Sequence, residues 1–177
     1  MLRYYLVKKK RNRQKEEKQD RDGNYSMSVP EDDSLSLLDP EFSSRFPLRI
    51  LLAEDNEINQ LVMERILGKL GYSVKIARNG REALEFLEKG IFDLIFMDVE
   101  MPEVDGLEAS RRIRENAETY RNPVIIALTA HAMDSDRKKC LDAGMDVFLT
   151  KPITLSKIVD VLREWAAKLR NRDGADS

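Results

Sequence analysis

The sequence predicts an α/β fold: a doubly wound, parallel β-sheet with helices on both faces. Short apolar runs alternate with stretches whose apolar residues recur at helical spacing. Runs that are apolar throughout are typical of strands buried on both faces of a parallel sheet. Gly71, Gly90 and Gly144 follow three of the helical stretches, where glycine commonly ends a helix. Right-handed crossovers between successive strands then give the strand order 2-1-3-4-5.

The expected elements follow one another from residue 49. The strands are expected at 49–53, 73–77, 93–97, 123–128 and 146–149. The helices are expected at 57–70, 80–89, 107–117 and 134–143, with a last helix from about Thr154. Helical spacing gives the first helix one apolar face, which consists of Ile58, Leu61, Val62, Ile66 and Leu70. The last helix has a longer apolar face that includes Trp165, so this tryptophan is expected to be a packing residue.

The 177 residues allow one domain with a full core and an extension. Residues 1–47 contain a basic run, Lys8 to Arg13, and a segment rich in Asp, Ser, Gly and Pro. This composition favours a flexible charged linker or tail, because it offers little apolar surface to bury. We therefore expect a single domain at 48–170 and a short tail at 171–177. The basic run is interpreted as a solvated segment in preference to a membrane or nucleic-acid contact.

Composition excludes several classes of function. Lys and Arg total 30 and Asp and Glu total 32, so overall charge points to no direct nucleic-acid partner. No apolar run reaches the length of about 18 residues that predicts a membrane span. Cys140 is the only cysteine, so the chain has no disulfide framework and a reducing, cytoplasmic location is expected.

Polar side chains follow four of the five predicted strands. Glu54 and Asp55 come after the first, Asp98 ends the third, Thr129 ends the fourth and Lys151 follows the fifth. Ligands of open parallel sheets bind outside the carboxyl ends of the strands. These side chains are therefore expected to converge on one site.

The residue types in this site suit a divalent cation and a phosphoryl group. Glu54, Asp55 and Asp98 would repel one another unless a cation lay among them, and Mg²⁺ favours oxygen ligands of this kind. The Asp98 carboxylate is the candidate nucleophile, since it can attack phosphorus to form an aspartyl phosphate. The Lys151 ammonium and the Thr129 hydroxyl can contact the phosphoryl oxygens.

Residues 49–170 resemble a response-regulator receiver domain with a flavodoxin-like (βα)5 fold. The resemblance is carried by four motifs, which are Ile50-Leu51-Leu52-Ala53-Glu54-Asp55-Asn56, Met97-Asp98-Val99-Glu100-Met101-Pro102-Glu103-Val104-Asp105-Gly106, Ala127-Leu128-Thr129-Ala130-His131 and Thr150-Lys151-Pro152. Segments around the start of the domain resemble those at the C-terminal receivers of hybrid sensor histidine kinases; they are Leu38-Asp39-Pro40-Glu41-Phe42, Phe46-Pro47-Leu48-Arg49-Ile50 and Asn56-Glu57-Ile58-Asn59-Gln60.

The resemblance implies a role for each site residue in a two-component phosphorelay. Asp98 is implied to be the phosphoacceptor, Glu54 and Asp55 the acidic metal-binding pair, and the Glu100 carbonyl a further Mg²⁺ ligand. Thr129 and Phe148 are implied to be the switch residues, and Lys151 to contact the phosphate. The Lys151–Pro152 bond is similar to one that is cis in the family.

The implied partner is a histidine kinase or a histidine phosphotransfer domain. Phosphorylation would then change the surface of the helix at 134–143, the strand at 146–149 and the last helix, through which a homodimer could form. The sequence contains no histidine-box helix and no Gly-rich nucleotide lid, so no kinase domain is expected. The chain is thus expected to be a fragment of a hybrid kinase, in which case it could be tethered to a membrane, or a stand-alone receiver.

Three other functions remain open from the residues alone. A phosphatase-like enzyme could use an aspartyl-phosphate intermediate, although such enzymes usually place a second Asp where this chain has Glu100. A receiver that is not phosphorylated could serve only to dock proteins, but the complete set of site residues disfavours this. Flavin binding is disfavoured because the loop after the first strand is acidic and would repel a phosphate.

Overall fold

The computed structural model describes residues 39–131 and 133–173. Five parallel strands form one sheet in the order β2-β1-β3-β4-β5, which confirms the predicted topology. The strands are β1 (Ile50–Ala53), β2 (Val74–Ala77), β3 (Leu94–Asp98), β4 (Val124–Thr129) and β5 (Val147–Thr150). All residues of β1, β3 and β4 are buried, as expected for central strands that are covered on both faces.

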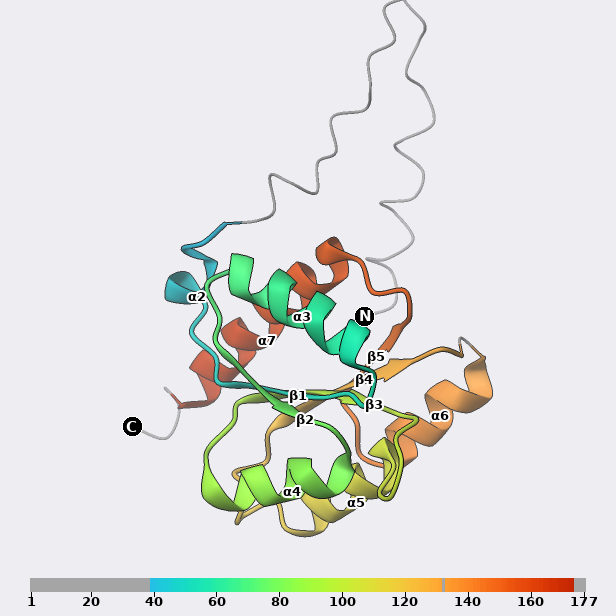
Figure 1. The fold of residues 1–177 in the computed structure, drawn as a ribbon. Coiled ribbons are helices and arrows are strands. Elements are labelled where there is room, and N and C mark those ends of the chain that lie inside the picture. The colour runs from blue at the N-terminus through green and yellow to red at the C-terminus, as the bar shows by residue number, and fades with distance from the viewer. Residues whose placement is uncertain (1–38, 132, 174–177) are drawn as a thin grey trace, which may run out of the picture. The chain divides into compact units, whose positions relative to one another are not determined.

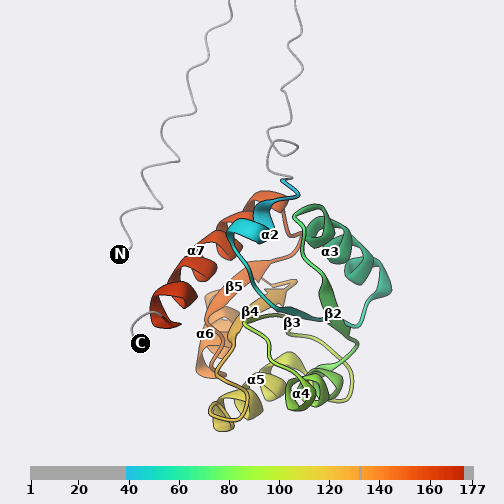
Figure 2. The same ribbon diagram turned by 90° about the vertical axis from the view of Figure 1, so that its left-hand side faces the viewer.

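Helices cover both faces of this sheet and make three layers (Figures 1 and 2). One face carries α3 (Glu57–Lys69) and α7 (Leu155–Asp173), with the short α2 (Phe42–Arg45) beside them. The opposite face carries α4 (Gly80–Lys89), α5 (Gly106–Glu115) and α6 (Asp134–Asp142). This is the doubly wound α/β architecture that the sequence predicts.

The core is divided by the sheet into two apolar layers. Because successive strand residues point to opposite faces, Leu52 and Phe96 pack toward α3 and α7, whereas Leu51, Ile95 and Met97 pack toward α4 and α5. Each layer is closed by the buried side of its helices. The sheet is thereby packed on both faces, and its carboxyl edge can position side chains.

Local signals set the helix ends near this edge. The side chains of Asn56, Asn79 and Asp105 accept hydrogen bonds from main-chain N–H groups in the first turns of α3, α4 and α5. Gly71 and Gly144, which follow α3 and α6, have φ of 86°, a conformation that favours glycine.

The apolar residues of α3 divide into a buried and an exposed set. Met63 and Leu67 are buried against the sheet, and Leu70 at the end of the helix joins them. Ile58, Leu61 and Val62, by contrast, are 73%, 46% and 49% exposed. The helix presents two apolar sides, and only one can face the sheet. The apolar face predicted for this helix is therefore only partly buried.

The folded chain includes α2, which lies before residue 48. Phe42 is buried beside Phe46 and Tyr72, and the Tyr72 hydroxyl donates a hydrogen bond to the Phe46 carbonyl. Part of the segment predicted to be linker thus packs against the domain. The prediction of a flexible tail concerns mainly residues 1–38, which lie outside the described residues, and the boundary at residue 47 stays a prediction.

Candidate functional site: an acidic cluster with a buried lysine

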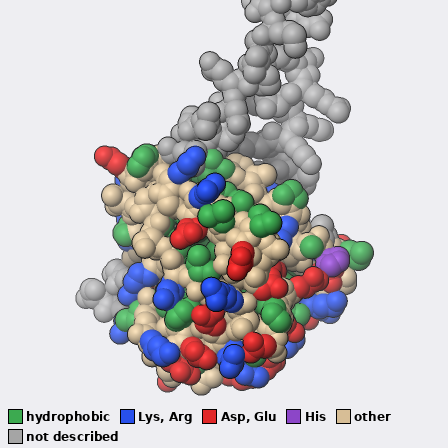
Figure 3. Space-filling model, in the orientation of Figure 1, with side chains coloured by type: hydrophobic (Ala, Val, Ile, Leu, Met, Phe, Trp, Pro, Cys, Tyr) green, Lys and Arg blue, Asp and Glu red, His purple; other side chains and the backbone are tan. Residues whose placement is uncertain are grey.

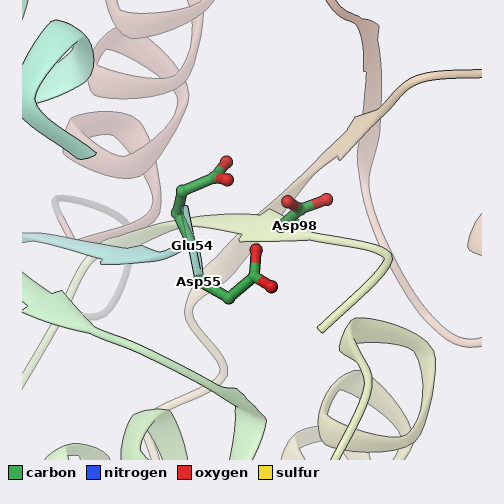
Figure 4. Close-up of side chains that lie close together, drawn as sticks. All are labelled: Glu54, Asp55 and Asp98. Carbon is green, nitrogen blue, oxygen red and sulfur yellow. The ribbon is translucent and has the colours of Figure 1, made fainter. Parts of the chain in front are cut away.

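Three carboxylates meet where β1 and β3 end. One oxygen from each of Glu54, Asp55 and Asp98 lies within 4.8 Å of the others, and Figure 4 shows the three groups side by side. Glu54 and Asp98 are buried, whereas Asp55 is exposed. The parallel register of β1 and β3 brings the two strand ends together, because Ala53 is paired with Met97 immediately before the acidic residues.

Lys151 reaches this cluster from the end of β5. Its ammonium nitrogen lies 2.5 Å from Asp98 Oδ2 and 2.7 Å from Glu54 Oε2, and it donates a hydrogen bond to each. Burial alone would lower the pKa of Lys151, but the hydrogen bonds to Asp98 and Glu54 and their negative charges outweigh it and raise this pKa. Lys151 is therefore held as a cation between two carboxylates.

The buried position of Asp98 makes ionisation of its carboxyl group unfavourable. Its pKa is raised from 3.8 to about 6, mainly by burial, and the negative charge of Glu54 acts in the same direction. The hydrogen bond from Lys151 and the charge of Lys151 act in the opposite direction but do not cancel the effect of burial. The cluster thus has more negative charge than its one lysine neutralises, which is the condition that favours a bound cation.

The loop after β3 is fitted closely around Asp98. The Glu100 N–H donates to Asp98 Oδ1 at 3.3 Å, and the Gly106 N–H donates to the Val99 carbonyl at 3.1 Å. A Cβ atom at Gly106 would overlap the main-chain oxygen of Asp98, so the loop requires glycine there. Glu100 belongs to this loop, and the role of its carbonyl as a Mg²⁺ ligand stays a prediction.

Thr129 and Phe148 lie on the neighbouring strands. Thr129 is buried at the end of β4, and its hydroxyl accepts a hydrogen bond from the His131 N–H at 3.1 Å. Phe148 is half-buried on β5, opposite Ala127 of β4, and packs with the apolar layer under α4 and α5. Their switch roles stay predictions. The Lys151–Pro152 bond is cis, as the resemblance implied.

Sequence reasoning missed two residues that hold Glu54. The Asn59 side-chain amide donates to Glu54 Oε1 at 2.8 Å, and the Gln60 amide donates to the Glu54 main-chain oxygen at 2.6 Å. The available signal was positional: with Asn56 as N-cap, Asn59 and Gln60 fall in the first turn of α3, next to the end of β1.

An exposed apolar surface adjoins the carboxylates. It consists of Ile58, Leu61 and Val62, and hydrophobic side chains are visible among acidic ones on the face that α3 presents in Figure 3. A small pocket connects this surface to the site, since Val62 lines it together with Glu54, Asn59 and Lys151. Exposed apolar side chains grouped in this way commonly mark an interaction surface.

No helix in the described part of the chain is long and apolar enough to cross a membrane.

Comparison with known proteins identifies similar sequences among histidine kinases. The chain is 43% identical over 132 residues to hybrid signal transduction histidine kinase K of Dictyostelium discoideum, and this match covers 71% of the chain and 11% of the kinase. It is 40% identical over 133 residues to the sensor histidine kinase GacS of Pseudomonas protegens, and this match covers 73% of the chain and 14% of the kinase. The chain therefore spans only a small part of the length of these relatives.

Solved structures of receiver domains are similar in fold and sequence. The receiver domain of the sensor histidine kinase PA1611 from Pseudomonas aeruginosa, solved with a magnesium ion coordinated in its active-site cleft, is 42% identical with a TM-score of 0.63. That match covers 68% of this chain and 98% of the PA1611 chain. The Ssk1 receiver domain of Saccharomyces cerevisiae, solved with the histidine phosphotransfer protein Ypd1, is 34% identical with a TM-score of 0.65, covering 68% of this chain and 89% of that one.

The receiver domain of the histidine kinase CKI1 from Arabidopsis thaliana, complexed with Mg²⁺ and BeF₃⁻, is 34% identical with a TM-score of 0.63, and the match covers 72% of this chain and 96% of that one. A family model described as the response regulator receiver domain matches residues 50–163, a range that contains the acidic cluster and Lys151. The chain belongs to the family of response regulator receiver domains.

Proposed function

We propose that Asp98 of this domain accepts a phosphoryl group from a phosphohistidine of a partner, in a Mg²⁺-dependent phosphorelay. The observation that carries the proposal is the placement of Asp98: a buried carboxylate between an acidic pair and the Lys151 ammonium, which lies 2.5 Å from Asp98 Oδ2. Phosphoryl transfer depends mainly on positioning and on neutralising charge, and the site offers both.

The donor set fits Mg²⁺. Glu54, Asp55 and Asp98 supply carboxylate oxygens, and the Glu100 main-chain carbonyl follows in the loop after Asp98. All of these are hard oxygen ligands, and Asp55 is exposed and accessible to an incoming ion. A bound Mg²⁺ would supply positive charge to the carboxylates and to the phosphoryl oxygens. The magnesium-bound PA1611 and CKI1 receiver domains support this assignment.

Residues of this chain carry the transfer step. An Asp98 carboxylate oxygen forms a bond to phosphorus while the bond from phosphorus to the histidine nitrogen breaks, and that nitrogen keeps the electron pair. Lys151 is placed to turn from the carboxylate to a phosphoryl oxygen, because its ammonium already contacts Asp98. The Thr129 hydroxyl can donate a hydrogen bond to another phosphoryl oxygen after a small inward movement.

The phosphodonor is proposed to be a histidine kinase or a histidine phosphotransfer protein that docks on α3. The exposed surface of Ile58, Leu61 and Val62 lies beside the acidic cluster, so a donor bound there would present its histidine to Asp98. The complex of the Ssk1 receiver domain with Ypd1 supports a partner of this kind. We further propose that the relay is cytoplasmic, because the single thiol, Cys140, is buried and unpaired.

Intact mass spectrometry after incubation with a small phosphodonor and Mg²⁺ tests this function. One phosphoryl group should be added to the wild type, and none when Mg²⁺ is chelated. The variant Asp98→Asn should show no mass increase, because an amide is not a nucleophile at phosphorus. Phosphorylation that persists unchanged in Asp98→Asn would refute the assignment of Asp98.

A further inference from the structure

The buried Glu54 carboxylate is held by two donors, one on each oxygen. Asn59 donates to Oε1 at 2.8 Å and Lys151 donates to Oε2 at 2.7 Å, and Glu54 is only 1% exposed. We propose that Asn59 is a positioning residue of the Mg²⁺ site, which keeps the Glu54 carboxylate oriented toward Asp55 and Asp98. This inference rests on the proposed function.

The position of Asn59 follows from the start of α3. Asn56 caps this helix by accepting hydrogen bonds from the main-chain N–H groups of Ile58 and Asn59. The first turn therefore lies next to the end of β1, and the Asn59 side chain points back to Glu54. The amide of the next residue, Gln60, donates to the main-chain oxygen of Glu54, whereas that of Asn59 donates to the carboxylate. The two amides thus act on different parts of the same residue.

The chemistry of an amide suits this position. An asparagine side chain donates a hydrogen bond to a carboxylate without adding charge to the acidic cluster. A second lysine there would compete with the metal ion, and an acidic residue would repel Glu54. Asn59 can therefore orient the Glu54 carboxylate while the net negative charge that attracts Mg²⁺ is kept.

Lys151 makes the contribution of Asn59 more important during the reaction. The Lys151 ammonium is shared between Glu54 and Asp98. When Lys151 turns to a phosphoryl oxygen, its hydrogen bond to Glu54 weakens. Among the described residues, Asn59 is then the side-chain donor that stays on this carboxylate. Glu54 consequently keeps its orientation in both states of the site.

The near-isosteric variant Asn59→Leu removes the donor and tests the proposal. Calorimetric titration of the full chain with Mg²⁺ should show affinity weakened by ~10-fold, the usual effect of removing a residue that orients a metal ligand. At saturating Mg²⁺, the rate of phosphorylation by a small phosphodonor should remain below that of the wild type, because Glu54 then loses both donors when Lys151 turns to a phosphoryl oxygen. Thermal unfolding without Mg²⁺ establishes that the variant is folded.

Gln60→Leu is the matched control, because it removes an amide that donates to the main-chain oxygen of Glu54. Its Mg²⁺ affinity should stay within about twofold of the wild type. Wild-type Mg²⁺ affinity in Asn59→Leu, or an equal loss in both variants, would overturn the role of Asn59. In either case, a wild-type chain that binds Mg²⁺ and is phosphorylated on Asp98 would leave the proposed function intact.

Discussion

Asp98 lies where its own charge destabilises the metal-free fold. Burial raises its pKa from 3.8 to about 6, so the folded state holds the proton more tightly than the unfolded chain does. A carboxyl of this kind contributes stability that is present below about pH 3.8 and is lost as the pH rises through about 6. At neutral pH, the folded domain therefore contains a buried carboxylate whose charge is unfavourable. A bound cation or a phosphoryl group on Asp98 can remove this unfavourable charge.

Asp98→Asn should accordingly stabilise the metal-free domain at neutral pH. A shift of about two pH units corresponds to about 3 kcal/mol, and this net shift already includes the opposing effect of Lys151. Urea unfolding in a chelator should show the variant more stable than the wild type at about pH 7.5, with the difference vanishing near pH 4. A difference that does not depend on pH would contradict this origin.

Asp55→Ala should weaken Mg²⁺ binding more than the change at Asn59 does. Asp55 is the exposed member of the acidic cluster and is proposed to be a direct ligand of the ion, so its removal takes one ligand from a small set. We expect a loss of affinity of more than ~10-fold by calorimetry and slower phosphorylation. Asp160→Ala, which removes an exposed acid on α7, is the control and should bind Mg²⁺ normally.

At the scale of elements, sequence patterns located the strands and most helices because the signals are local. Uniformly apolar runs gave β1, β3 and β4, and glycines marked the ends of α3 and α6. The burial of α3 was harder to predict, since Ile58 and Val62 follow helical spacing as well as Met63 and Leu67 do. Which apolar side faces the sheet depends on tertiary packing. The four-residue α2 is too short to show any periodicity.

Helix α2 is expected to stabilise the domain although it precedes the predicted boundary. Phe42 is buried, its ring lies 4.8 Å from that of Phe46, and the main-chain N–H of Ser43 donates to the Leu70 carbonyl. Phe42→Ala should lower the free energy of unfolding by about 3 kcal/mol, the usual cost of truncating a buried phenylalanine. Urea unfolding measures this, and the exposed Ser44→Ala on the same helix should change little. Equal stability of Phe42→Ala and the wild type would show that α2 is dispensable.

At the scale of the whole molecule, the strand order made it possible to predict a site whose residues are dispersed along the sequence. Glu54, Asp98 and Lys151 are far apart in the sequence, but parallel strands bring their carboxyl ends to one edge. The contact between Asn59 and Glu54 was not predictable in the same way. It depends on a side-chain conformation in the first turn of a helix, which residue order alone does not determine.

The same strand order connects the site to a distant surface. Thr129 ends β4, and Phe148 lies on the adjacent β5, which belongs to the surface of α6, β5 and α7. A phosphoryl group on Asp98 would draw the Thr129 hydroxyl inward and leave space that the Phe148 ring can enter. Because Phe148 is already half-buried, the added burial contributes about 1 kcal/mol, which shifts a two-state equilibrium roughly fivefold.

Thr129→Ala should therefore separate phosphorylation from the change on this surface. The variant keeps Asp98, the acidic pair and Lys151, so it should still be phosphorylated. Without the hydroxyl, no hydrogen bond draws the end of β4 toward the phosphoryl group, and Phe148 keeps its position. Amide hydrogen exchange across residues 130–165 should change on addition of phosphodonor in the wild type and in the control Thr150→Ala but not in Thr129→Ala.

If a partner or a second copy binds this surface, its affinity for Thr129→Ala should no longer depend on phosphorylation. Identical exchange changes in the wild type and Thr129→Ala would show that the switch does not pass through this threonine.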